Sequence, residues 1–302
     1  MKKIKRNIVC SFLILKKIVA IGLFIFLVGN ILLYSYCYLT PKLSIHKSQS
    51  YYLYDNNNKL IFNDSDDWIS LDKISPYLIN ATLSTEDKFF YRHLGFDYFR
   101  IFKAALKNLQ SRSLKEGAST ITQQYARNLF LNYEKTWSRK IDEAILAAEL
   151  ETHYTKEEIL EGYLNTINYG GVYGIESASW YYFGHSAKDL TLSEASMLAG
   201  IPQSPANYSP ITNEKNAKKR QKVVLLSMYH QGFIQKEEMD NAYNYSLTYI
   251  GKSNQSSLEN VLYFRDSVIE EIKSIDTISP STLQSGGLKI YTTLDVDAQH
   301  SL

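Results

Sequence analysis

The chain has 302 residues, of which 45% are hydrophobic and 13% aromatic, so it can bury a substantial core. The net charge of +2 conceals an asymmetry: residues 1–54 hold eight basic and no acidic residues, whereas the remainder holds 25 basic and 31 acidic residues. This acidic larger part excludes a uniformly basic nucleic-acid-binding protein. Both cysteines, Cys10 and Cys37, lie near the N-terminus, which excludes a disulfide framework from the rest.

Residues 18–39 form an uncharged, mostly apolar run of 22 residues, and about 20 apolar residues suffice to cross a bilayer as a helix. Six of the eight basic residues precede this run. The positive-inside rule therefore predicts residues 1–17 in the cytoplasm and everything after Thr40 on the outer face of the cell (inner) membrane. A cleaved signal peptide is the alternative, but the run is long for a signal and no small-x-small cleavage site follows it.

After the apolar run, residues 51–62 resemble two short strands around an Asn-rich turn, and helical signals then dominate. Capping residues and apolar spacing predict helices from Ser75 to about Tyr91, from Asp97 through Leu109, from about Thr120 to Leu131, from Thr136 through Ala148, from Thr155 through Leu164, from Thr191 through Leu198 and from about Glu214 to His230. A polar stretch at 246–257, a helix over 258–275 and a strand within 286–294 complete the pattern.

These elements predict a mainly α protein with one N-terminal transmembrane helix and one helical domain of ordinary size. The expected divisions are a cytoplasmic basic tail at 1–17, the transmembrane helix at 18–39, a short β and linker segment at 40–74, the helical domain at 75–245, and a linker with the start of an incomplete C-terminal region at 246–302.

The first candidate for chemistry is Glu86-Asp87, at an expected helix end beside three aromatic residues and His93. A carboxyl group among apolar rings suits general acid or base catalysis. The alternative is a solvated helix end whose acids pair with Lys88 or Arg92. This cluster alone does not decide between the two interpretations.

The second candidate is the segment 116–128, where small and hydroxyl residues open a helix whose N–H groups can receive an anion. Gln123 and Arg127 are four residues apart and share a helix face, so both could address a polar ligand. An ordinary Ser/Thr cap with a solvated Gln/Arg face is the alternative.

The third candidate is Lys135–Glu143, which places three cations within six residues, a composition that can hold phosphate groups. Glu143 would be a second carboxylate, positioned by those cations. The alternative is an intrahelical ion pair between Arg139 and Glu143. A fourth cluster, 156–165, carries acids on an exposed face, where Glu161 and Asn165 could brace the neighbouring structure.

Taken in order, these clusters resemble the family 51 glycosyltransferases, the peptidoglycan glycosyltransferase domain of class A penicillin-binding proteins. The resemblance covers about residues 51–250 and rests on five blocks: Glu86-Asp87-x-x-Phe90-x-x-His93-x-Gly95; Gly117-Ala118-Ser119-Thr120-Ile-Thr-Gln123-Gln124; Arg139-Lys140-x-x-Glu143; Ile159-Leu160-Glu161-x-Tyr163-Leu164-Asn165; and Tyr182-Phe183-Gly184-His185 leading into Leu192-x-Glu194-Ala195-x-x-Leu198-Ala199-Gly200. One block alone would be weak, and five in order are specific.

The resemblance implies a lysozyme-like helical fold that polymerises lipid II into β-1,4 glycan strands with inversion and release of polyprenyl pyrophosphate. It implies that Glu86 is the general base and that Glu143 is the second catalytic carboxylate. The residues that it assigns to substrate binding are Asp87, Ser119, Gln123, Arg127, Lys135, Arg139 and Lys140. The family usually carries Lys at the position of Arg127, often Arg at that of Lys135 and commonly Lys at that of His185.

The resemblance implies no obligatory cofactor, although a divalent cation such as Mg²⁺ or Mn²⁺ would be compatible with Glu143. The implied partners are lipid II, the growing glycan strand, membrane lipid and other cell-wall synthesis proteins, with no nucleic acid. The Ser-x-Asn and Lys-Thr-Gly elements of a transpeptidase are absent from these 302 residues. A membrane-anchored muramidase or lytic transglycosylase, and a non-catalytic cell-wall scaffold, are the alternative functions.

Overall fold

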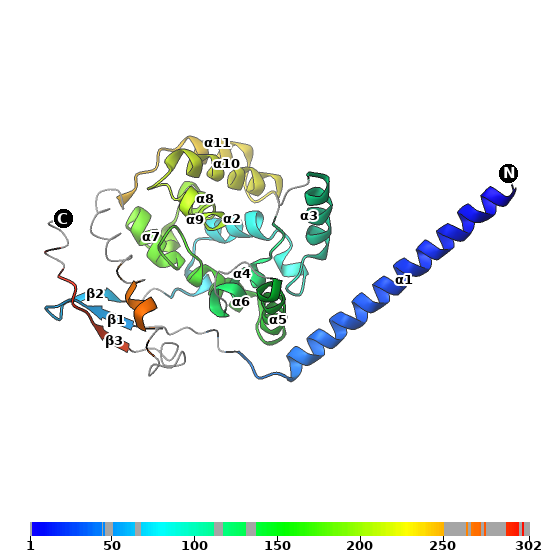
Figure 1. Ribbon diagram of the computed structural model, residues 1–302. Helices are drawn as coiled ribbons and strands as arrows, with labels where there is room; N and C mark the ends of the chain where they lie inside the picture. The colour runs from blue at the N-terminus through cyan, green and yellow to red at the C-terminus, as the bar shows by residue number, and fades with distance from the viewer. Residues whose placement is uncertain are drawn as a thin grey trace.

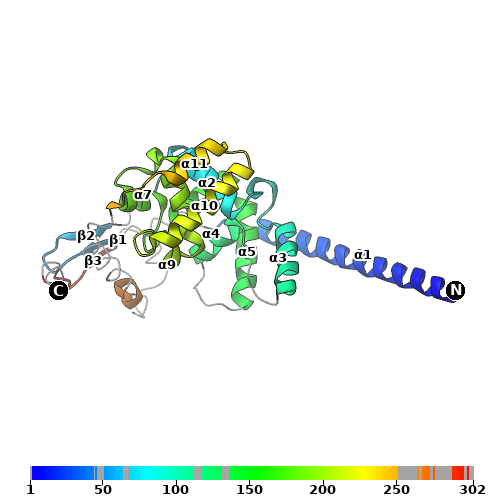
Figure 2. The same ribbon diagram turned by 90° about the horizontal axis from the view of Figure 1, so that it is seen from above.

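A computed structural model describes residues 2–43, 45, 51–63, 68–111, 117–130, 137–250, 264, 267–272, 275, 288–295 and 298. A long helix, α1, projects from one end of a helical body, and a small β-sheet lies at the opposite end (Figure 1). The view from above shows the same arrangement, with the helices of the body between α1 and the sheet (Figure 2). The protein is therefore mainly α, as the sequence predicts.

Helix α1 runs from Lys2 to Leu39, so the basic segment before the apolar run is helical as well. Residues 2–17 contain no proline or glycine that would interrupt it. The stretch Lys16–Leu39 is long and apolar enough to cross a membrane, and its most apolar window is not buried inside the protein. Near the C-terminal end of α1, Cys37 is fully buried against the body, and its carbonyl oxygen lies 2.8 Å from Nε2 of His153.

Helix α2 (Pro76–Glu86) ends sooner than the expected Tyr91, because the backbone leaves the helical region at Asp87, with φ −155° and ψ 78°. A short 3₁₀ turn, η2 (Phe90–Arg92), follows. Helix α3 (Tyr98–Ser111) begins where the sequence predicts, and Asp97 caps it by accepting a hydrogen bond from Arg100 N at 2.8 Å. The expected cap residue of the first helix, Ser75, makes no side-chain cap bond.

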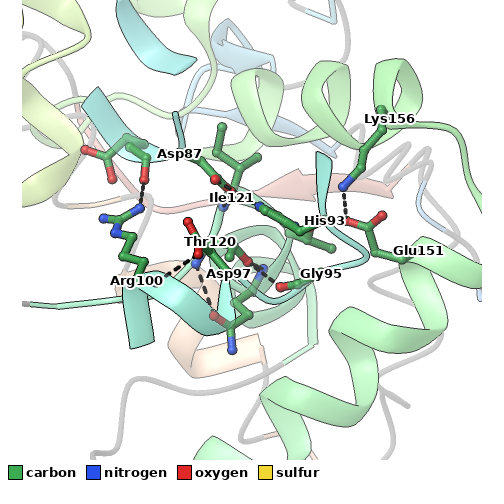
Figure 3. Close-up of polar contacts among 12 residues, drawn as sticks. Asp87, His93, Gly95, Asp97, Arg100, Thr120, Ile121, Glu151 and Lys156 are labelled. Carbon is green, nitrogen blue, oxygen red and sulfur yellow. Dashed lines mark hydrogen bonds and ion pairs between the residues drawn. The ribbon is translucent and has the colours of Figure 1, made fainter. Parts of the chain in front are cut away.

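Helices α4 (Ile121–Phe130), α5 (Trp137–His153) and α6 (Lys156–Thr166) pack together, and α4 is mostly buried. Gly162 on α6 admits the Tyr125 ring, since a Cβ there would lie 2.1 Å from Tyr125 Oη. Glu151 of α5 accepts a 2.5 Å bond from Thr122 Oγ1 of α4 and pairs with Lys156 Nζ of α6 at 2.6 Å, the latter drawn in Figure 3. These contacts fix the orientation of α4, which carries part of the second cluster.

The remaining helices follow α6 in the chain and are joined by short connections, and α8 and α10 among them pack against α2. They are α7 (Ile175–Phe183), α8 (Leu192–Leu198), α9 (Pro205–Tyr208), α10 (Glu214–His230) and α11 (Lys236–Asn244), with 3₁₀ turns η1 (Leu71–Lys73), η3 (Ala187–Asp189) and η4 (Ile201–Gln203). The expected capping boxes are present, with Thr155 and Glu158 at α6 and Thr191 and Glu194 at α8. Helix α10 packs against both α2 and α8.

The sheet has the order β2-β1-β3, with β1 at Tyr51–Tyr54, β2 at Leu60–Asn63 and β3 at Leu288–Tyr291. Strands β1 and β2 form the expected antiparallel hairpin, in which Leu53 faces Phe62. Strand β3, expected from the sequence to begin a new unit, pairs in parallel with β1. Much of the helix expected over 258–275 lies outside the described residues, and the described positions 264 and 267–272 are helical.

Candidate active site

The first site residue, Glu86, is the last residue of α2, and it is 8% exposed. Its carboxylate contacts two elements that are remote in sequence. Gln124 of α4 donates from Nε2 to Glu86 Oε2 at 2.9 Å, and Arg220 of α10 places Nη2 3.5 Å from Oε1. Arg100 of α3 donates to the Glu86 backbone oxygen. Three helices therefore fix the position of this carboxyl group.

Asp87 is 1% exposed and joins the end of α2 to the start of α4. Its Oδ1 lies 2.9 Å and its Oδ2 3.1 Å from His93 Nε2. Oδ2 also accepts a 3.0 Å bond from Ile121 N, the first residue of α4. Figure 3 shows Asp87, His93 and Ile121 converging. A carboxylate is favourable at a helix N-terminus, so Asp87 stabilises this junction; its predicted contact with substrate stays a prediction.

The start of α4 is closed by a reciprocal pair of bonds between Thr120 and Gln123. Thr120 N donates to Gln123 Oε1 at 3.1 Å, and Gln123 N donates to Thr120 Oγ1 at 3.2 Å. Thr120 Oγ1 in turn donates to Gly95 O at 2.7 Å. The side-chain carbonyl of Gln123 thus serves the helix cap, and its amide group is what remains for the predicted substrate contact.

Glu143 lies on α5 with a side chain that is 0% exposed, and its partners are on the same helix. Arg139 Nη1 is 3.4 Å from Glu143 Oε2, the ion pair that the spacing predicts. Lys140 Nζ contacts Glu143 Oε1 and also donates to Ser119 Oγ at 2.9 Å. The second and third sequence clusters therefore meet at Lys140.

Arg127 is partly exposed near the end of α4, where it influences Tyr163 of α6. Burial raises the pKa of the Tyr163 hydroxyl well above its ordinary value, the negative charge of Glu86 raises it further, and Arg127 opposes the shift. Tyr163 Oη also lies 3.5 Å from Gln124 Oε1. Lys135, the remaining predicted cation, lies outside the described residues.

Two residues at this site were missed by the sequence analysis. Gln124 belongs to the quoted second block but was given no role, and its contact with Glu86 depends on how α4 packs against α2. Arg220 was included only as part of a basic helix. The position of Arg220 along α10 could have indicated an inward-facing side chain, because it lies next to the buried residues Ala217, Gln221 and Val224.

A divalent cation finds no suitable set of ligands among the described residues. No three His, Cys, Asp or Glu side chains there are grouped so that they could hold a metal ion. Both oxygens of Glu143 already face cationic side chains, which would repel a metal ion. The compatibility of Glu143 with a divalent cation stays a prediction, and the reaction below uses only protein groups.

Comparison with known proteins identifies the domain that carries this site. The family model named Transglycosylase matches residues 56–229, more than half of the chain. Penicillin-binding protein 2D of Bacillus subtilis (strain 168) is 46% identical over 229 residues, which are 76% of this chain and 33% of that protein. Penicillin-binding protein 1A of Aquifex aeolicus (strain VF5) is 41% identical over 234 residues, covering 77% and 31% of the two chains.

The chain spans about a third of the length of these relatives. Penicillin-binding protein 1A of Clostridium tetani (strain Massachusetts / E88) is 39% identical over 293 residues, 86% of this chain and 36% of that protein. The crystal structure of penicillin-binding protein 1A from Haemophilus influenzae matches 83% of this chain and 27% of its own with a TM-score of 0.42 and 23% identity, too loosely to add to the fold assignment.

The apolar helix α1 and the relatives together suggest a membrane-anchored protein. The five sequence blocks fall within or close to the matched region, and four of them meet around α4, with Glu86 and Asp87 on one side and Lys140 and Glu143 on the other. The chain belongs to the transglycosylase family, the glycosyltransferase domain of class A penicillin-binding proteins.

Proposed function

We propose that this domain polymerises lipid II into peptidoglycan glycan strands at the outer face of the cell membrane. The observation that carries the proposal is the first turn of α4. Lys140 donates to Ser119, which lies just before this turn. Gln124 lies within the turn and donates to Glu86. A candidate base and a cation cluster thus flank one helix N-terminus, which itself favours anions.

Glu86 is the proposed general base. The 4-hydroxyl oxygen of the acceptor sugar attacks C1 of the donor sugar, and the hydroxyl proton passes to the Glu86 carboxylate. The bond from C1 to the phosphate oxygen breaks, and attack from the opposite face inverts the configuration at C1. A positioned base contributes about 10²–10⁴-fold to the rate.

The cation cluster is the proposed site of the leaving pyrophosphate. Negative charge develops on the phosphate oxygen as its bond to C1 breaks, and fixed cations lower the energy of that transition state. Lys140 has 41% of its side chain exposed and is held by Ser119 and Glu143. Arg139 lies beside it, and Arg127 and Lys135 are the further candidates. Glu143 orients Arg139 and Lys140 and partly neutralises them in the absence of substrate.

The membrane side of the protein supports a lipid-linked substrate. Helix α3 exposes Tyr98, Phe99, Phe102 and Leu106, and Tyr98 Oη donates to Asn30 Oδ1 of α1. The first residue of this amphipathic helix therefore contacts the apolar span, as expected for a helix that enters a membrane interface. In this orientation the N-terminus is cytoplasmic, and other cell-wall synthesis proteins would meet the domain outside the membrane.

The test is incubation of the full chain in detergent with labelled lipid II. We expect polymer growth from the parent protein and from Glu157→Gln, a control at an exposed glutamate of α6. Glu86→Gln keeps the shape of the side chain and removes the base, so polymerisation should fall by about 10²–10⁴-fold.

Three other results would contradict the proposal. Near-full polymerisation by Glu86→Gln would exclude Glu86 as the base. Cleavage of preformed glycan by the parent protein would indicate a muramidase or lytic transglycosylase, whose glutamate donates a proton instead. Glycan binding with neither growth nor cleavage would indicate a scaffold.

A further inference from the structure

Arg220 reaches the Glu86 carboxylate from α10, although it lies outside the five blocks that the sequence analysis identified. The Arg220 and Glu86 side chains are only 11% and 10% exposed. Burial lowers the pKa of the Arg220 guanidinium, and the adjacent Glu86 opposes this shift. A guanidinium keeps its proton throughout the physiological range, so Arg220 presents a permanent positive charge to Glu86.

The contacts around Glu86 fix its direction without using all of its acceptor capacity. Arg220 lies at Oε1, and Gln124 donates to Oε2. Arg100 holds the backbone oxygen of the same residue. An ionised carboxylate has about four acceptor positions, so lone pairs remain for the hydroxyl of an incoming sugar.

Gly200 makes room for the Arg220 side chain. A Cβ added at Gly200 would lie 2.9 Å from Arg220 Cγ, closer than real Cβ contacts allow. The backbone at Gly200 has φ −79° and ψ −25°, which any residue can adopt. A glycine is therefore needed there for its lack of a side chain and not for its backbone conformation. Arg220 Nε donates to Gly200 O at 3.4 Å, and its guanidinium carbon is 5.9 Å from the centre of the Tyr208 ring.

We propose that Arg220 is a positioning residue for Glu86, with Gly200 as the position that lets its side chain pass. The inference rests on the proposed function, in which Glu86 accepts the proton of the acceptor hydroxyl. Arg220 touches no reacting atom and transfers no proton. It prevents the carboxylate from rotating away from the acceptor, because its guanidinium lies 3.5 Å from Glu86 Oε1.

The groups that bear on the charge of Glu86 come from several elements. They are the cations Arg220 and Arg100, the adjacent acid Asp87, and the phenols Tyr163 and Tyr169. Burial and Glu86 itself keep the two phenols protonated at neutral pH. Among these groups, Arg220 is the cation whose side chain meets the Glu86 carboxylate. Its removal should therefore change the pH dependence of the reaction as well as the rate.

The experiment measures polymerisation of labelled lipid II by the full chain in detergent, as kcat and KM across a pH series. Arg220→Gln should lower kcat about ten- to a hundredfold, with little change in KM, and should move the acid limb of the kcat profile to higher pH. Arg220→Lys keeps the charge and should recover part of kcat and the parent pH profile. Gly200→Ala keeps every charge but obstructs the Arg220 stem, and kcat should fall again.

Lys219→Ala is the matched control, since Lys219 is exposed on the same helix; it should behave as the parent. A parent-like kcat and pH profile in Arg220→Gln would overturn the inference. So would a fall in kcat with an unmoved acid limb and a lower thermal unfolding midpoint, because that pattern indicates only a structural role. If Arg220→Gln does not fold, the inference is tested with Arg220→Lys and Gly200→Ala. A parent-like kcat in both of these variants would overturn the inference.

Glu86→Gln, measured in parallel, separates this inference from the proposed function. If Glu86→Gln abolishes polymerisation while Arg220→Gln leaves it unchanged, Glu86 remains the base and only the role of Arg220 is excluded. If Glu86→Gln polymerises lipid II normally, the base assignment itself fails.

Discussion

Glu86 and Glu143 are both buried carboxylates, but the chain holds them in opposite ways. The partners of Glu143, Arg139 and Lys140, lie four and three residues before it on α5. The side-chain partners of Glu86 come from α4 and α10, and its backbone is held from α3. The position of Glu143 therefore depends on one helix, whereas that of Glu86 depends on how three helices pack around the end of α2.

This difference separates two tasks. A cation cluster for a leaving phosphate must neutralise charge, and flexible side chains can do so from one helix. In the proposed function, Glu86 is the base and must point at one hydroxyl within about 0.5 Å, and packing from several helices can provide that accuracy. The two acids should accordingly respond differently when each is shortened by one methylene.

Among the variants that compare the two acids, Glu86→Asp has the largest expected effect. The charge stays, but the carboxylate retreats from both Gln124 and Arg220, and neither partner can follow because both side chains are buried. A displacement of about 1 Å can cost a hundredfold in rate, so kcat for lipid II polymerisation should fall about a hundredfold. A loss below threefold would mean that the three-helix arrangement does not aim the base.

Asp87→Asn tests the junction on which the Glu86 side of the site rests. The amide cannot supply the negative charge that faces His93 and the Ile121 N–H. We expect the free energy of unfolding to fall by about 1.5–3 kcal/mol, the range for hydrogen bonds to charged groups. Chemical denaturation would measure it, with Asp240→Asn, at an exposed site on α11, as the control. Equal stability of the two variants would contradict the role assigned to Asp87.

Glu143→Asp should have a smaller effect than Glu86→Asp. The side chain of Lys140 is 41% exposed and flexible, so it can follow the shortened carboxylate and keep its contact. We expect kcat to fall by less than about tenfold, consistent with the rearrangement of an ion pair at about 1 kcal/mol. If Glu143→Asp were as damaging as Glu86→Asp, the contrast between the two acids would not hold.

The smallest expected effect concerns His185, whose partner Glu194 lies 3.2 Å away at the surface. Partial burial lowers the pKa of His185, but the Ser186 carbonyl and Glu194 outweigh it and the net shift is upward. Because the folded pKa lies above the unfolded one, the ion pair stabilises the fold below about pH 6.5. This stability is lost as the pH rises through the folded pKa.

His185→Gln should therefore lower the free energy of unfolding by at most about 1 kcal/mol at acidic pH, since solvent screens this partly exposed pair. The difference from the parent should vanish at about pH 8.5, where the histidine is neutral in both states. Unfolding curves at about pH 5.5 and 8.5 would measure it. A difference that grows with pH would contradict the sign of this shift.

The sequence predicted the features that are decided locally. Capping bonds at Asp97, Thr155 and Thr191 depend on three or four neighbouring residues, and all three are present. The pair of Arg139 and Glu143 follows from helical spacing alone. Even so, the end of α2 was misjudged, because the turn at Asp87 is set by its bonds to His93 and to α4.

Features that depend on packing between distant segments could not be predicted from a single sequence. The contact of Gln124 with Glu86 joins residues 38 apart, and that of Arg220 comes from a helix still farther along the chain. The parallel pairing of β3 with β1 is likewise non-local, as the bond from Thr292 Oγ1 to Tyr54 O spans 238 residues. No periodicity or motif specifies such partners.

The contact between α3 and α1 sets how deep the catalytic body would sit. Tyr98 meets Phe26 and Asn30, which lie nine or more residues before the end of the apolar span at Leu39. At about 1.5 Å per residue, that is some 13 Å below the outer end of α1. When the span lies in a bilayer, the start of α3 is submerged with it. In the proposed function, a lipid carrier would then approach Glu86 by lateral diffusion, without the cost of about 0.8 kcal/mol for each methylene drawn into water.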